Sequence, residues 1–392
     1  MADKAPITPK ILAWARESAR ISVEDAAKKA GVKKERIVEW EKGESLPTIR
    51  QAKLLAEAYK RSFALFFLPE IPTDFQPLQD FRKPGSLSLS TGSLFIIREI
   101  QQKQAWISAV NEENEESRIP FVGRFKMSDG IDKVAKNMLE TLGINPFAYE
   151  RSNPILEWVE KAESKGVFVS RTSFIHSRLK LDSKELQGFA ISDSYAPFVF
   201  VNSEDWNAPQ LFTLVHELAH LWIAKSGISN EVHPEPKSNS KFHPVELFCN
   251  SVAASALMPK ELFNSLPESA FSSGKSIFNE AKKFGVSSFA FLVRALNLGL
   301  ISHNKYGSLK KEADKEFKVF LEREAIKKAK QKANPKGGGP DYYLLALNKN
   351  SRLFTQTVLD AYKSGSIEPT EASSLLNVKV NKFPKLEERL YR

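Results

Sequence analysis

Hydrophobic positions recur at helical spacing over most of the chain, and this pattern predicts a mostly helical protein. In the first 70 residues, short apolar stripes alternate with brief turns, and Gly31 and Gly43 mark two points where a helix should end. The pattern therefore predicts a small helical domain at the start of the chain. The expected helices cover residues 10–20, 23–30, 33–42 and 47–61.

Between residues 166 and 202 the period of the pattern changes from 3.6 to 2, which is typical of strands. Three strands are expected, at residues 166–171, 186–192 and 197–202. Helical spacing flanks them on both sides, and two or three small helices are expected in the last 50 residues. The predicted fold class is α+β, mostly helical, with a small three-stranded sheet. The other expected helices are 93–117, 129–142, 153–165, 207–225, 244–257, 259–265, 275–283, 287–298 and 309–333.

Two segments have the composition of linkers. The stretch from Leu68 to Pro77 is too rich in proline for a helix, and residues 334–340 are rich in glycine and proline. These breaks predict four regions: a helical domain at 1–68, a linker or arm at 69–92, a main domain at 93–305 with its core at about 150–300, and a C-terminal helical region at 306–392.

Composition narrows the class of protein. With 42% hydrophobic and 27% charged residues among 392, the chain is neither disordered nor fibrous. It contains no apolar run of 18 residues and no signal-peptide pattern at its start, so we expect no membrane partner and a cytoplasmic location. Its single cysteine, Cys249, excludes an internal disulfide. The net charge of +10 permits a nucleic-acid partner without requiring one.

The segment His216-Glu-Leu-Ala-His220 is the strongest chemical signal in the sequence. Two histidines four residues apart lie on one face of a helix, where both imidazoles can bind one Zn²⁺. Glu217 lies beside such a metal and can move a proton to and from a metal-bound water. The alternative is two histidines at helical spacing without a metal. The apolar flanks argue against it, because buried polar groups need partners.

A catalytic zinc requires a third protein ligand, and three residues downstream are candidates. His233 lies in a polar segment broken by prolines, while His243 precedes an apolar helix that begins with Val245 and Glu246. A carboxylate on an apolar helix is costly to bury without a cation, which favours Glu246. The alternatives are His243 as the ligand, or a Glu246 that only complements the helix dipole. Two histidines and a carboxylate also suit Mn²⁺ or Fe²⁺.

These residues resemble a known family. His216-Glu-Leu-Ala-His220 is similar to the catalytic motif of ImmA/IrrE-type metallopeptidases, and Glu246-x-x-x-Asn250 with Leu257-Met-Pro is similar to their second signature. The resemblance implies a zincin-like domain in which Glu246 is the third zinc ligand, Glu217 the catalytic residue and Asn250 a support for the active-site helices. Cys249 and Val252 depart from the family's usual alanine and phenylalanine.

The N-terminal region carries a second resemblance, to the Xre/Cro-type helix-turn-helix. It rests on Ile21-Ser-Val-Glu-Asp-Ala-Ala-Lys-Lys-Ala-Gly-Val, Ile37-Val-Glu-Trp-Glu-Lys-Gly and Leu46-Pro-Thr. In that fold the helix at about 33–42 enters the major groove, so Lys33, Lys34 and Arg36 are the expected DNA contacts. Val23 stands where the family commonly has a glutamine that binds phosphate. A helical domain that binds only protein is therefore the alternative.

The short segment Asp80-Phe-Arg82 looks like a signature that joins these two domains in long Xre–ImmA/IrrE proteins. The combined resemblance implies a zinc-dependent endopeptidase that cleaves a transcriptional repressor or another protein partner in stress or mobile-element regulation. Its helix-turn-helix domain would bind DNA or a repressor. The competing hypothesis is a DNA-binding regulator without proteolytic activity, such as the antitoxin of a toxin–antitoxin pair.

Overall fold

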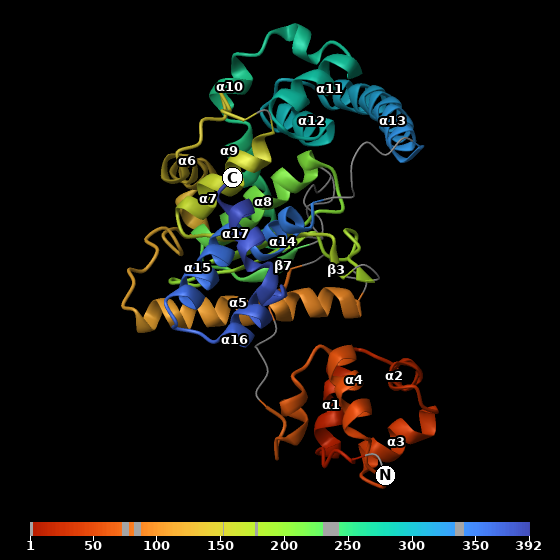
Figure 1. Cartoon of the computed structure of the whole chain (residues 1–392). Coiled ribbons are helices and arrows are strands. Elements are labelled where there is room, and N and C mark those ends of the chain that lie inside the picture. The colour runs from red at the N-terminus through yellow and green to blue at the C-terminus, as the bar shows by residue number, and fades with distance from the viewer. Residues whose placement is uncertain are drawn as a thin grey trace. The chain divides into compact units, whose positions relative to one another are not determined.

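The computed structural model describes residues 3–72, 78–81, 88–151, 153–176, 179–229, 243–333 and 341–392 (Figure 1). The described residues form two compact units. The smaller one draws on Met1–Pro77, Ser88–Gln101 and Ile175–Leu179, and the larger one on Leu78–Leu87, Gln102–Phe174 and Lys180–Arg392. None of the described helices combines the length and apolar character needed to cross a bilayer.

The smaller unit is built from short helices that begin and end at identifiable residues. Ser22 caps one helix by accepting a hydrogen bond from the Asp25 N–H, and Thr48 caps another in a capping box with Gln51. Gly31 ends its helix with φ of +68°, a conformation that favours glycine. These helices are α1 (Pro9–Ser18), α2 (Val23–Ala30), α3 (Lys34–Lys42) and α4 (Ile49–Tyr59), followed by the short η1 (Phe63–Phe67). All four predicted helices are therefore present.

The sheet of the larger unit contains the three predicted strands, β2 (Phe168–Thr172), β5 (Gly188–Ile191) and β6 (Phe198–Asn202). In the described residues the sheet has two further, short strands, β7 (Gly227–Ser229) and β1 (Gln79–Asp80), in the order β1-β7-β5-β6-β2. The pairs β2–β6 and β1–β7 are parallel, whereas β5 is antiparallel to both β6 and β7. A separate pair joins β3 (Phe174–His176) to β4 (Leu179–Lys180).

Two buried helices position the candidate site. Helix α8 (Asn207–Trp222) lies against β5 and β6, and α9 (Pro244–Leu257) packs against α8. From Gln210 onward every residue of α8 is buried, as expected for a helix that is apolar on nearly all sides. Helices α5 (Thr91–Glu113), α6 (Ile131–Leu142) and α7 (Pro154–Ser164) lie between β1 and β2 in the chain. Helices α10 (Lys260–Asn264), α11 (Gly274–Lys283), α12 (Ser288–Asn297) and α13 (His303–Ala333) follow α9.

The end of the chain folds back onto the sheet of the larger unit. Helix α14 (Tyr342–Asn350) lies against β2, where the Ser170 hydroxyl donates a hydrogen bond to the Lys349 carbonyl over 2.5 Å. Where two or three helices were predicted, the described residues contain four: α14 (Tyr342–Asn350), α15 (Arg352–Lys363), α16 (Pro369–Leu376) and α17 (Phe383–Leu390) (Figure 1).

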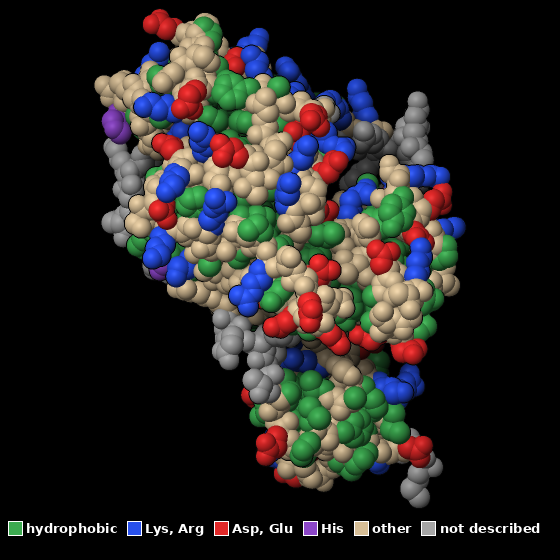
Figure 2. Space-filling model, turned by 90° about the vertical axis from the view of Figure 1, so that its left-hand side faces the viewer, with side chains coloured by type: hydrophobic (Ala, Val, Ile, Leu, Met, Phe, Trp, Pro, Cys, Tyr) green, Lys and Arg blue, Asp and Glu red, His purple; other side chains and the backbone are tan. Residues whose placement is uncertain are grey.

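The predicted Gly-rich linker at 334–340 lies outside the described residues, as does much of the predicted arm at 69–92. The division into 1–68, 69–92, 93–305 and 306–392 stays a prediction. On the face drawn in Figure 2, Lys and Arg side chains are interspersed with Asp and Glu over the larger unit. The net positive charge is thus not gathered into one basic patch on this face.

Candidate metal centre

Three buried side chains converge between α8 and α9. The Nε2 atoms of His216 and His220 lie 3.1 Å apart, and the Glu246 carboxylate lies 3.2 Å from the first and 3.1 Å from the second. Both histidines are 0% exposed and Glu246 is 3% exposed. Among the described residues, this is the group of His, Cys, Asp and Glu side chains whose donor atoms could share one metal ion.

The donor atoms fit a tetrahedral metal ion. Zinc binds nitrogen and carboxylate oxygen at about 2.0–2.1 Å, so two ligand atoms of a tetrahedron lie about 3.3 Å apart. The three separations of 3.1–3.2 Å are close to that value. Glu246 holds its negative charge here: although burial opposes ionisation, the two histidines lower its pKa to about 2. The chemistry and spacing of the donors therefore fit a divalent cation.

His216 is oriented through its second ring nitrogen. Its Nδ1 donates a hydrogen bond to Oδ1 of Asn250 over 3.0 Å, which leaves the Nε2 lone pair free to face Glu246 and His220. Asn250 lies one turn after Glu246 on α9, and its side chain thus reaches across to α8. The structure places Asn250 at the site, in the position where the sequence predicts a supporting residue.

Glu217 lies next to this cluster and is 0% exposed. Neither of its carboxylate oxygens has a hydrogen bond of ordinary geometry to the described residues, although the Ser229 hydroxyl lies close enough to lower the pKa of Glu217. Burial raises its pKa to about 8, an effect that His216 opposes and the negative charge of Glu246 reinforces. Strand β5 passes so close that a Cβ atom on Gly188 would lie 2.7 Å from Glu217 Oε1, so this position requires glycine.

The other two candidates for a third ligand are not part of the cluster. His243 caps α9 by accepting a hydrogen bond from the Val245 N–H over 3.3 Å, and it is absent from the group of converging donors in the described residues. His233 lies outside the described residues. Among the residues that the structure describes, the geometry therefore favours Glu246 as the candidate for the third ligand.

The predicted DNA-contacting residues lie at the start of α3 in the smaller unit. Lys33, Lys34 and Arg36 are all exposed, and Arg36 forms an ion pair with Glu39 over 2.6 Å. Ile37 and Trp40 face the core with 0% and 1% exposure. The N-terminal end of α3 thus carries three exposed cations, one of which pairs with an acid on the same helix.

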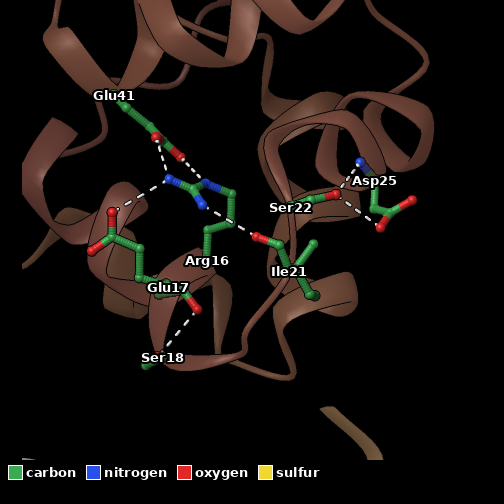
Figure 3. Close-up of polar contacts among 8 residues, drawn as sticks. Arg16, Glu17, Ser18, Ile21, Ser22, Asp25 and Glu41 are labelled. Carbon is green, nitrogen blue, oxygen red and sulfur yellow. Dashed lines mark hydrogen bonds and ion pairs between the residues drawn. The ribbon is translucent and has the colours of Figure 1, made fainter. Parts of the chain in front are cut away.

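A partly buried ion pair fixes α3 against α1. Arg16 donates two hydrogen bonds to the Glu41 carboxylate, over 2.7 and 2.9 Å, and a third to the Ile21 carbonyl over 3.2 Å (Figure 3). Both side chains of the pair are only 12% exposed. This bidentate contact orients the C-terminal half of α3 and gives Glu41 a structural role.

Comparison with known families finds a match for the region of the candidate metal ligands and another for the N-terminal helices. Residues 162–296, which include the candidate metal ligands His216, His220 and Glu246, match the IrrE N-terminal-like domain. Residues 12–66 match a helix-turn-helix domain. The chain joins a helix-turn-helix domain to an IrrE N-terminal-like domain. Both resemblances that the sequence predicts are therefore confirmed.

One curated relative is the radiation response metalloprotease IrrE of Deinococcus deserti. It is 30% identical to this chain over 95 residues, which are 24% of this chain and 34% of that protein. The chain thus matches about a third of the relative's length. The comparison indicates a metallopeptidase-type domain.

Two residues near the cluster of the IrrE N-terminal-like domain were not predicted from the sequence. The Ser229 hydroxyl at the end of β7 lies 3.4 Å from both His216 Nε2 and Glu246 Oε1. The Phe81 ring stacks on the imidazole of His220, with centroids 5.5 Å apart and an interplanar angle of 11°. Ser229 carries no sequence signal, because β7 is too short to recognise. Phe81 belongs to the Asp80-Phe-Arg82 signature, of which Arg82 lies outside the described residues.

Proposed function

We propose that the IrrE N-terminal-like domain is a zinc-dependent endopeptidase. His216, His220 and Glu246 would hold the metal, and Glu217 would be the catalytic base. The observation that supports this most strongly is the convergence of three buried donors beside Glu217, a second carboxylate that is 0% exposed. Three protein ligands leave one tetrahedral position for water or substrate, as catalytic zinc sites require. The same donors also suit Mn²⁺ and Fe²⁺.

When bound, the metal supplies an activated water and polarises the scissile carbonyl. The chain's own residues supply the rest. Glu217 lies close enough to His216 and Glu246 for their charges to shift its pKa, so it is placed to take a proton at its carboxylate and pass it to the leaving amine. Burial raises its proton affinity, and a bound cation acts in the opposite direction. Asn250 keeps the His216 ring in the orientation that the ligand role needs.

We propose further that the substrate is a transcriptional repressor or another protein partner, cleaved to switch on a stress or mobile-element response. The presence of a helix-turn-helix domain in the same chain supports this class of substrate, since it brings the peptidase to operator DNA or to a repressor of similar fold. The name of the relative, a radiation response metalloprotease, is consistent with a role in stress regulation.

For the helix-turn-helix domain we propose DNA contacts through Lys33, Lys34 and Arg36. Their exposure at the N-terminal end of α3 supports this assignment. A mobility-shift assay with the DNA upstream of the gene, run over a salt series, tests it. Binding driven by phosphate contacts weakens steeply with salt, and each lost contact lowers the slope by about one. The triple alanine variant should bind weakly, whereas Lys10→Ala, an exposed lysine on α1, should bind like wild type.

The peptidase proposal is tested with Glu217→Gln, which removes the base and keeps the size of the side chain. A lysate of the host cell is incubated with zinc-loaded wild type or variant, and new protein N-termini are identified by mass spectrometry. We expect new termini with wild type and none with the variant, while both proteins retain zinc. Equal sets of termini would contradict the proposal and favour the regulator or antitoxin without proteolytic activity.

A further inference from the structure

The two histidines of the metal cluster are oriented by different contacts. Asn250 holds His216 through a hydrogen bond at Nδ1. Nδ1 of His220 makes no hydrogen bond of ordinary geometry to the described residues. Burial lowers the pKa of His220, and the nearby backbone of Lys225 opposes that shift. Instead, one face of the His220 ring is covered by Phe81 in a nearly parallel stack. The Phe81 ring also contacts the ring of His243, the residue that caps α9, with the two ring centroids 4.9 Å apart.

The position of Phe81 is specified by the backbone around it. Strand β1 pairs with β7 in parallel, with Asp80 opposite Ile228, and the Phe81 N–H donates to the Ile228 carbonyl over 3.1 Å. The Phe81 side chain is only 2% exposed.

Gly227 on β7 makes room for the ring. A Cβ atom at this position would lie 2.1 Å from Phe81 Cε2, so any other residue would push the ring away from the histidine. The pairing of β1 with β7 and the absence of a side chain at Gly227 thus place the Phe81 ring against His220.

A histidine ligand binds well only when its ring plane is fixed with the Nε2 lone pair directed at the metal. Hydrogen bonds to the other nitrogen usually do this, and their loss typically weakens metal binding 10- to 100-fold. A parallel aromatic ring restricts the same rotation, because turning the imidazole about its Cβ–Cγ bond would drive it into the stacked face. The stack therefore acts on the same degree of freedom as a hydrogen bond at Nδ1.

We propose that Phe81 is a positioning residue of the metal centre, acting through His220. This inference rests on the proposed function, since it requires that His220 bind a metal. Phe81 lies outside both matched domains, at 12–66 and 162–296, in the sequence between them. The IrrE N-terminal-like domain is thus completed by a residue from the preceding segment of the chain.

The test measures zinc affinity of the full chain by competition with a chromophoric chelator, together with the visible spectrum of the Co²⁺-substituted protein. Phe81→Ala should bind zinc about tenfold more weakly and show an altered Co²⁺ spectrum. Phe81→Leu keeps most of the volume and loses the flat ring, so it should fall between alanine and wild type. Phe81→Tyr keeps the stack and should restore both readouts.

Phe263→Ala is the matched control. Phe263 is 1% exposed in the same hydrophobic core and packs on Phe284 and Phe291. Its truncation should lower Tm and leave zinc affinity and the Co²⁺ spectrum unchanged.

The outcomes separate this inference from the proposed function. If wild type binds no metal, both fail. If wild type binds zinc, and a folded Phe81→Leu or Phe81→Ala has the same affinity and spectrum, the positioning role is wrong and the metal site stands. Unchanged zinc affinity with faster proteolysis would also overturn it, because residues 78–81 would then obstruct the site. If Phe81→Ala does not fold, Phe81→Leu and Phe81→Tyr decide the question.

Discussion

The Asn250 side chain on α9 accepts a hydrogen bond from Nδ1 of His216 on α8 over 3.0 Å. The same helix α9 carries Glu246 one turn earlier, and its carboxylate lies 3.2 Å from the other nitrogen of that ring. A single imidazole is therefore held at both nitrogens by residues of one neighbouring helix. The packing of α9 on α8 fixes two of the three donors relative to each other.

Asn250→Ala should weaken zinc binding by about 10- to 100-fold, because His216 then loses the contact that sets its tautomer and ring plane. Zinc affinity is measured by chelator competition at constant pH. Ser251→Ala is the control, since among the described residues the Ser251 hydroxyl bonds the Leu247 carbonyl of its own helix and no part of the metal centre. An Asn250→Ala protein that binds zinc as tightly as Ser251→Ala would show that the Asn250 contact is not needed.

Glu163 should make stability depend on pH. Burial raises its pKa to about 7, against the hydrogen bonds from the Ser351 hydroxyl and from backbone N–H groups, while the ordinary value is 4.5. The folded state therefore holds this proton more tightly than the unfolded state does. The resulting stabilisation is complete below about pH 4.5 and is lost as the pH rises through about 7. The shift corresponds to about 3 kcal/mol.

Glu163→Gln, a neutral mimic that does not titrate, isolates this effect. Wild type and variant are unfolded by heat at pH 5 and pH 8, and the difference in Tm between them is compared. We expect wild type to lose stability relative to the variant at the higher pH. A difference that stays constant across this range would mean that Glu163 is ionised in the folded protein at pH 5.

Glu41→Ala should loosen the helix-turn-helix domain. It leaves the Arg16 guanidinium, 12% exposed, without its two strongest hydrogen bonds, and bonds to charged groups contribute about 1.5–3 kcal/mol each. Hydrogen exchange followed by mass spectrometry should show a free energy of opening lower by about 3 kcal/mol in α1 and α3. Glu44→Ala is the control. Glu44 is 60% exposed and its ion pair with Lys42 is long, at 4.0 Å, so its loss should change the free energy of opening little. Equal exchange rates in the two variants would contradict the structural role of Glu41.

The sequence predicted most of what depends on local pattern. The helices of the first 60 residues carry their caps and glycine stops in the sequence, and the spacing of His216 and His220 needs only a helix to place both rings together. Glu246 was predictable because a carboxylate on the apolar helix α9 requires an opposite charge. Its contact with the histidines then confirms the geometry but leaves its chemical role a prediction.

What the sequence could not predict depends on contacts between distant segments. Strands β1 and β7 have two and three residues, too few for a periodic pattern, and each exists through pairing with its neighbours. The stack of Phe81 on His220 joins residues far apart in the chain, and a lone Phe81 in a polar segment gives no sign of it. The four helices after residue 341 are short. Of these, α14 and α15 contact β2, and Ser351 at the start of α15 donates a hydrogen bond to Glu163, which are contacts between segments distant in sequence.

The central claim is that His216, His220 and Glu246 hold a catalytic metal, and elemental analysis of the purified full chain tests it most directly. We expect about one zinc per chain in wild type and in Glu217→Gln, and a near-complete loss in Glu246→Ala, because removing the carboxylate leaves two neutral ligands. Treatment with a chelator should remove the zinc from wild type, and added zinc should restore it. Wild type without any divalent metal, or a Glu246→Ala variant that keeps its full zinc, would contradict the account.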